Sequence, residues 1–131
     1  MMNELFAAIY IRLNDQLSIN VYDHVPEDLA SSNYPFIRID AIQTANNDTD
    51  SENGFTATMQ VVGFSQYRGI KEINTVADSV YDALQHWSFP DTATYGISGI
   101  QESFRNMAVQ PDGLTRNSVQ QYEIIFEKLP I

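Results

Sequence analysis

The residues best able to do chemistry form an acidic segment near the middle of the chain, where Asp48, Asp50 and Glu52 alternate with polar residues. Carboxylates at such spacing can supply the oxygen ligands that calcium prefers. An EF-hand loop starting at Asp48 would, however, need glycine at its sixth position and glutamate at its twelfth, where this chain has Asn53 and Met59. The pattern favours a solvated acidic loop, and a bound cation stays open as the alternative.

The two histidines offer little further chemistry. His24 lies in a strand-to-loop region, and His86 lies near a predicted helix C-terminus, where the macrodipole favours a cation and explains the residue structurally. The chain lacks a nucleophile elbow, a zinc-binding helix motif and a phosphate-binding glycine loop. We therefore expect neither catalysis nor a cofactor. A metal-dependent or hydrolytic enzyme built on these histidines and the acidic segment is the alternative from another class.

Charge and composition restrict the partners. The 131 residues include 17 acidic and 7 basic side chains, which give a formal net charge of -10. A surface of this sign repels nucleic acid instead of releasing its counterions, so ordinary DNA or RNA binding is disfavoured. The chain has no cysteine, which suits a reducing cytoplasm. No stretch reaches the roughly 18 apolar residues of a membrane span, and we expect no membrane partner.

The pattern of secondary structure is clearest between residues 55 and 84. Apolar and polar residues alternate over 55–61, which predicts a strand with one buried face. After the connection at 66–69 the spacing becomes helical and predicts an amphipathic helix over 70–84. Its apolar face consists of Ile73, Val76, Ala77, Val80 and Leu84.

The rest of the chain completes an α+β pattern. It predicts a helix over residues 4–13, a short strand near 19–21, a strand over 36–43 with one buried face, and strands over 99–109 and 115–129 joined through a turn at 111–113. Residues 46–54 contain no apolar side chain and predict a mobile loop. We expect a single domain over residues 1–131, with two main helices packed on one face of an antiparallel sheet.

Two further segments could form contacts. Trp87, Phe89 and Tyr95 lie in a predicted loop that packs its own aromatics, and a small-molecule site beneath this loop is a third option without a defining polar motif. Tyr67 and Arg68 lie at an element boundary and are residue types favoured at protein interfaces. These two residues are therefore candidate contact residues.

Four segments together resemble the tail completion proteins of long-tailed phages, also described as tail-to-head joining proteins. They are VYDHVPED at 21–28, YPFIRI at 34–39, SQYRGIKEINTVADSVYDAL at 65–84 and PDGLTRNSVQQYEI at 111–124. The resemblance spans nearly the whole chain from the first helix to the final strand. Each motif is weak singly, and their order and spacing carry the match.

The resemblance implies a structural virion protein. The implied subunit forms a hexameric ring at the head-proximal end of the tail, where it joins the tail tube protein to the head connector or stopper protein. During assembly it would be in the host cytoplasm. DNA would pass through the lumen without specific binding. The alternative is a tail terminator, a related ring that caps the tube and stops its polymerisation.

The residues that match the family pattern are candidates for contacts, and none is a catalytic position. They include Tyr67, Arg68 and the turn followed by Arg116, while the acidic loop departs from the pattern. Six copies would carry a formal charge of about -60, and a negative lumen would let DNA pass without sticking. We predict that Asp48, Asp50 and Glu52 line the lumen or an axial face.

Overall fold

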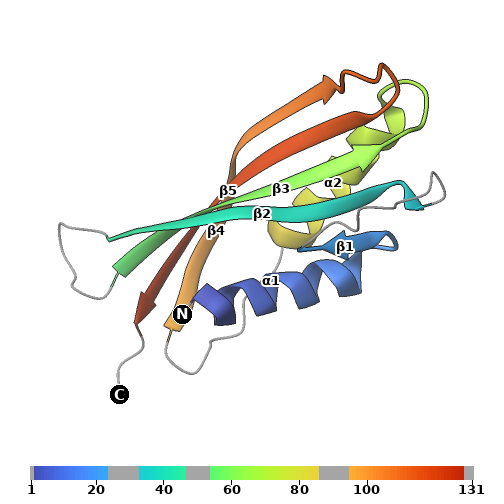
Figure 1. Cartoon of the computed structure of the whole chain (residues 1–131). Helices are drawn as coiled ribbons and strands as arrows, with labels where there is room; N and C mark the ends of the chain where they lie inside the picture. The colour runs from blue at the N-terminus through green and yellow to red at the C-terminus, as the bar shows by residue number, and fades with distance from the viewer. Residues whose placement is uncertain (1, 24–32, 47–53, 86–94, 129–131) are drawn as a thin grey trace.

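The computed structural model describes residues 2–23, 33–46, 54–85 and 95–128, which form two helices and five strands (Figure 1). In chain order these are α1 (Met2–Gln16), β1 (Asn20–Tyr22), β2 (Phe36–Asn46), β3 (Gly54–Ser65), α2 (Lys71–Gln85), β4 (Tyr95–Val109) and β5 (Arg116–Lys128). Both helices and all five strands were predicted from the sequence, with shorter bounds for most of them.

The strands form one sheet in the order β1-β2-β3-β5-β4. All neighbours are antiparallel except β1, which pairs with β2 in parallel. Figure 1 shows a strongly twisted sheet with both helices on the same side. The α+β prediction is therefore confirmed. One correction concerns the sheet, which was predicted to be antiparallel, whereas β1 pairs with β2 in parallel. The direction of so short a strand leaves no trace in its own alternation pattern.

The core lies between this face of the sheet and the two helices. Leu5, Ile9 and Leu13 recur every four residues along α1 and are almost fully buried, as expected for one face of a helix. They share a core with the predicted apolar face of α2 and with alternate strand residues such as Met59 and Ile124. The Arg12 guanidinium adds a polar tie between the helices, since Nε donates a 2.8 Å hydrogen bond to the Ala83 carbonyl.

A polar network joins α2 to β4 and β5 inside this core. Gln120 Nε2 lies 2.9 Å from the Ala77 carbonyl oxygen, 2.8 Å from Glu102 Oε2 and 3.0 Å from the Tyr122 hydroxyl. Arg105 donates to the same Glu102 oxygen at 3.1 Å and to Asp78 at 2.7 Å. Burial, reinforced by the negative charge of Glu102, raises the pKa of Tyr122 far above its ordinary value, so the phenol stays protonated.

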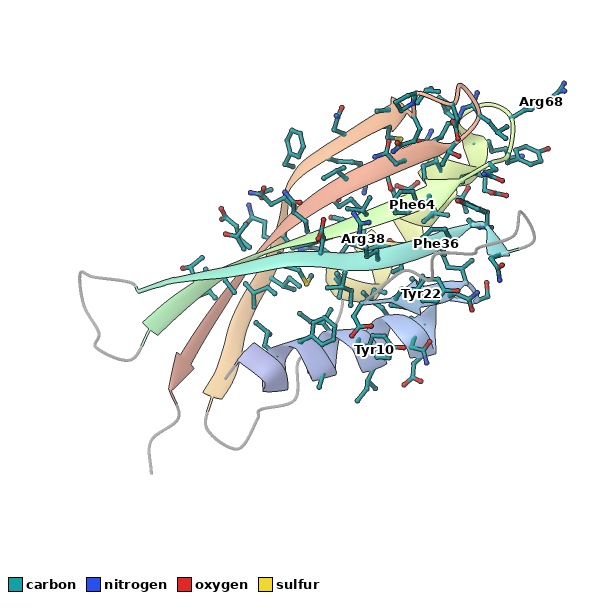
Figure 2. All side chains as sticks on the ribbon, viewed as in Figure 1. Tyr10, Tyr22, Phe36, Arg38, Phe64 and Arg68 are labelled. Carbon is teal, nitrogen blue, oxygen red and sulfur yellow. The ribbon has the colours of Figure 1, made fainter. Side chains whose placement is uncertain are left out.

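The opposite face of the sheet departs from the prediction at Phe36. The alternation of β2 predicted one buried face, yet Phe36 is only 2% exposed although it points away from its core-facing neighbour Ile37. Other rings cover it: the Phe64 ring stacks at 4.8 Å between centroids, and Tyr34 and Tyr22 contact it at 5.0 and 5.4 Å. Tyr22, Phe36 and Phe64 lie on β1, β2 and β3 (Figure 2), and Tyr34 precedes β2. Cross-strand stacking thus buries Phe36, while the predicted alternation holds over residues 37–40.

Two element boundaries also differ from those predicted. β2 continues through the polar residues to Asn46, which pairs with Phe55, so the connecting segment is shorter than the predicted loop. β4 begins at Tyr95 and thus includes the end of the predicted aromatic loop. In both places pairing with a neighbouring strand satisfies backbone groups that the side-chain pattern alone assigns to a loop. The turn at 111–113 and the antiparallel hairpin of β4 and β5 are confirmed.

Candidate functional site

Two connections meet at one end of the sheet and form the surface that we call the tip, defined as residues 66–72 and 109–116. The antiparallel register explains the meeting, because Arg116 at the start of β5 pairs with Ser65 at the end of β3 and with Val109 at the end of β4. The tip therefore contains Tyr67, Arg68 and Arg116, three of the six predicted contact residues. In Figure 2, Arg68 points away from the body of the molecule at this end.

Arg116 ties the two connections together. Its Nη1 atom donates hydrogen bonds to the Tyr67 carbonyl at 3.2 Å and to the Leu114 carbonyl at 3.0 Å. A parallel link runs from Gln66 Nε2 to Thr115 Oγ1 at 3.2 Å. The bonds to Tyr67 and from Gln66 each reach across 49 positions of sequence, so Arg116 helps to position the connection that carries Tyr67, and its predicted contact role stays a prediction.

The connection that precedes α2 is fixed by Ser65, which is fully buried. Its hydroxyl donates to Glu72 Oε1 at 2.7 Å and accepts the Tyr67 N–H at 3.2 Å. Gly69 has a φ of 82°, a left-handed conformation that glycine adopts without steric cost. The Ile70 carbonyl then accepts the first helical hydrogen bond, from Asn74 at 3.0 Å, which places Ile70 at the N-cap of α2. The Tyr67 backbone is thus held from both sides.

The turn between β4 and β5 is built around Asp112. Its Oδ1 atom accepts the N–H groups of Leu114 at 2.9 Å and Thr115 at 2.8 Å, and Oδ2 accepts the Thr115 hydroxyl at 2.7 Å. These bonds, led by the one from the Thr115 N–H, lower the pKa of the Asp112 carboxyl. Gly113 follows with a φ of 72°. The carboxylate therefore fixes the turn that carries Leu114.

The turn should lose its Asp112 contribution to stability in acid. A carboxyl whose pKa is lowered by folding stabilises the protein above the unfolded-state pKa of about 4, and this stabilisation disappears as the pH falls through the lower folded-state pKa. We expect Asp112→Asn to be less stable than the wild type at pH 7. Urea denaturation at a series of pH values should show the difference shrinking as the pH falls below about 4. A difference that stays constant over this range would contradict the assignment.

Four large apolar side chains project from the tip into solvent. Tyr67 is 61% exposed, Ile70 64%, Val109 56% and Leu114 46%, and they account for four of the seven exposed large hydrophobic residues in the described part of the chain. Tyr67 lines two shallow surface depressions, one together with Tyr34 and Leu114 and the other together with Lys71 and Thr75. An exposed aromatic ring beside cationic side chains is the composition of a protein contact surface.

The other three predicted contact residues belong to the acidic segment. Asp48, Asp50 and Glu52 lie outside the described residues, as do His24, His86 and the aromatic segment at 87–94. The strand ends that flank the acidic segment, Asn46 and Gly54, lie at the end of the sheet opposite the tip (Figure 1). Given a rise of about 3.3 Å per residue, the twelve residues of β3 place Gly54 roughly 35 Å from Ser65, which adjoins the tip.

Within residues 2–23, 33–46, 54–85 and 95–128, no group of three or more His, Cys, Asp or Glu side chains is arranged to hold a metal ion. No helix in this part of the chain combines the length and the apolar character needed to cross a membrane. The tip also includes three residues that the sequence did not single out as contacts: Ile70, Val109 and Leu114. The sequence did contain a signal for them, because each is an apolar residue in or next to a predicted turn or connection, where its side chain is far from the core.

Comparison with known proteins identifies a family and similar solved structures. A family model described as tail completion protein gp17 matches residues 7–127. Among solved structures, a chain of the "Virion of native gene transfer agent (GTA) particle" is similar with a TM-score of 0.79 and 17% sequence identity, and the match covers 94% of each chain. At this identity the likeness shows a shared fold. The comparison with curated protein sequences found no match.

Proposed function

The chain belongs to the family of tail completion protein gp17, and from this premise we propose that it is a structural virion protein acting at the head-proximal end of a phage tail. In this proposal, copies of the chain form a ring that joins the tail tube to the head connector, and the net charge of -10 per copy disfavours specific binding of the ring to DNA. The observation that carries the proposal is the exposed tip within a chain that matches the family over residues 7–127.

The construction of the tip supports a role in contact. Its apolar side chains are held on a backbone fixed by Arg116, Ser65 and Asp112, so little conformational freedom remains to be lost on binding. Contact surfaces derive much of their binding free energy from a few aromatic and arginine side chains that are well packed in the complex. Tyr67 and Arg68 are of these types and lie at the exposed end of the molecule.

The polar groups of the tip serve the structure, which favours a role without catalysis. The Asp112 carboxylate accepts three hydrogen bonds within its own turn, and Glu72 accepts one from the buried Ser65 hydroxyl. Arg116 is bonded to two carbonyl oxygens. Groups used in this way orient the backbone, so we assign the tip to assembly.

The acidic segment completes the proposed ring. Asp48, Asp50 and Glu52 follow a strand that ends at Asn46, roughly 35 Å from the tip along β3. We propose that these carboxylates face the lumen or an axial surface. Because the acidic segment and the tip are far apart, the tip can contact another protein without touching the acidic segment of its own chain. Negative charge in the lumen would repel the DNA backbone and favour passage over binding.

Two isoleucines provide a matched test of the proposal. Ile70 at the tip and Ile11 on α1 are 64% and 60% exposed, so each can be changed to serine without opening the core. Serine is also a favoured N-cap residue, so Ile70→Ser should preserve the start of α2. In particles that depend on a plasmid copy of this chain, we expect the double variant Tyr67→Ser/Ile70→Ser to lower infectious titre by about 100-fold, which corresponds to about 1.4 kcal/mol for each of two contact residues.

Electron microscopy of the same particles separates the outcomes. The proposal predicts filled heads and tails of normal length that remain unjoined, while Ile11→Ser particles stay joined and infectious. Tails of uncontrolled length would instead identify a terminator that stops tube polymerisation. Normal titre with the double variant would contradict a contact role for the tip, and normal titre without the chain would contradict the proposed function itself.

A further inference from the structure

Charge is distributed unevenly between the tip and the rest of the chain. The tip contains three basic residues, Arg68, Lys71 and Arg116, and two acidic ones, Glu72 and Asp112. Its formal charge is therefore +1, and the remaining residues of the -10 chain carry -11. Both acidic groups accept hydrogen bonds from neighbouring residues, Glu72 from the adjacent Ser65 and Asp112 from its own turn, whereas Arg68 and Lys71 are exposed. The tip is thus a cationic and apolar end of a strongly acidic protein.

We propose that the tip of each copy docks on the acidic surface of the next copy of the same chain. This inference rests on the proposed ring and names the occupant of the tip within it. Copies that each carry -10 repel one another over most of their surface. Approach through the tip replaces this repulsion with attraction, because Arg68 and Lys71 then face the carboxylates of the neighbour.

Ring geometry requires a contact of this kind. A closed ring of more than two copies is built from heterologous contacts, in which two different surfaces of the subunit meet. Surfaces of opposite sign satisfy this requirement and disfavour the symmetric contact of one tip with another, since Arg68 would then face its own equivalent. Tyr67 and Ile70 would supply the apolar anchors, and Arg116 would hold the Tyr67 backbone in place without touching the neighbour.

The small exposed area of the tip indicates that the contact should be measured in assembled particles. Four side chains that are each about half exposed offer much less than the roughly 800 Å² per partner of a standard stable interface. A pair of isolated copies would therefore separate easily, and the contact gains strength from closure of the whole ring. The experiment must accordingly use assembled particles.

A photo-crosslinking residue at position 67 identifies the occupant directly. With p-benzoylphenylalanine replacing Tyr67 in otherwise intact particles, we expect illumination to give a species of twice the mass of the chain, with peptides from this chain alone. The same replacement at Ile11, on α1, should give at least fivefold less of it. Crosslinks from position 67 to a tube, connector or other virion protein, or no crosslink in particles that contain the chain, would overturn the proposal.

Charge variants test whether electrostatic attraction directs the tip to a second copy of the chain. The paired changes Arg68→Gln/Lys71→Gln and Arg68→Glu/Lys71→Glu should lower the self-crosslink by about threefold and tenfold. Both replacements at position 71 are compatible with the first turn of α2, where an acidic residue is favoured. An unchanged yield would overturn the electrostatic choice of a second copy. Infectivity that requires the chain while position 67 crosslinks to another protein would contradict this inference alone and leave the proposed function standing.

Discussion

Gln120→Leu should lower the free energy of unfolding by about 2–4 kcal/mol, because the leucine fills the space but cannot replace the hydrogen bonds of a buried network. Gln120 is 1% exposed, and its amide lies 2.8 Å from the partly buried Glu102 carboxylate and 3.0 Å from the Tyr122 hydroxyl. The variant leaves these groups against an apolar side chain. Urea denaturation monitored by circular dichroism measures the loss.

The adjacent residue supplies the control for this measurement. Gln121 lies one position further along β5, so its side chain points to the face of the sheet away from the helices. Gln121→Leu should change the free energy of unfolding by no more than about 0.5 kcal/mol. Equal effects of the two variants would show that the network contributes nothing beyond ordinary strand packing.

Gly63→Ala should cost about 1–3 kcal/mol even though alanine is ordinarily better than glycine in a strand. A β-carbon at position 63 would lie 2.7 Å from Ser118 Oγ and 3.1 Å from Val76 Cγ1, so these side chains, or the elements that carry them, must shift to admit it. Gly63 pairs directly with Ser118, and both positions lie beneath α2. Small side chains here allow the helix to approach the sheet closely.

Gly99 and Ser118 make the second prediction specific. Gly99 lies in β4 with no atom within 4 Å of the place where a β-carbon would be, so Gly99→Ala should be neutral or stabilising. Ser118→Gly removes the atom that crowds position 63, and the double variant Gly63→Ala/Ser118→Gly should regain much of the lost stability. Thermal or urea unfolding of all four proteins tests this, and a strictly additive double variant would rule out the steric explanation.

Local periodicity predicted the elements because it reports which face of a segment is apolar. The alternation over 55–61 and the helical spacing over 73–84 both correspond to buried faces, with Met59, Val61 and Leu84 fully buried. The turn at 111–113 was predicted from proline, aspartate and glycine, and the Asp112 hydrogen bonds show why that order forms a turn. The suggested family is confirmed by the match over residues 7–127. The extent of a single domain and the contact roles of the predicted residues stay predictions.

The helices, most of the strands and the acidic character of this protein could be predicted from its sequence, because they depend on neighbouring residues or on composition alone. Three features became visible only in the folded chain: Arg116 holds Tyr67, aromatic rings bury Phe36, and Gln120 belongs to a buried polar network. Each of these contacts joins residues from different elements or connections. Strand order and pairing bring such residues together, whereas side-chain periodicity within one segment reports which face is buried but does not say which strand lies next to it.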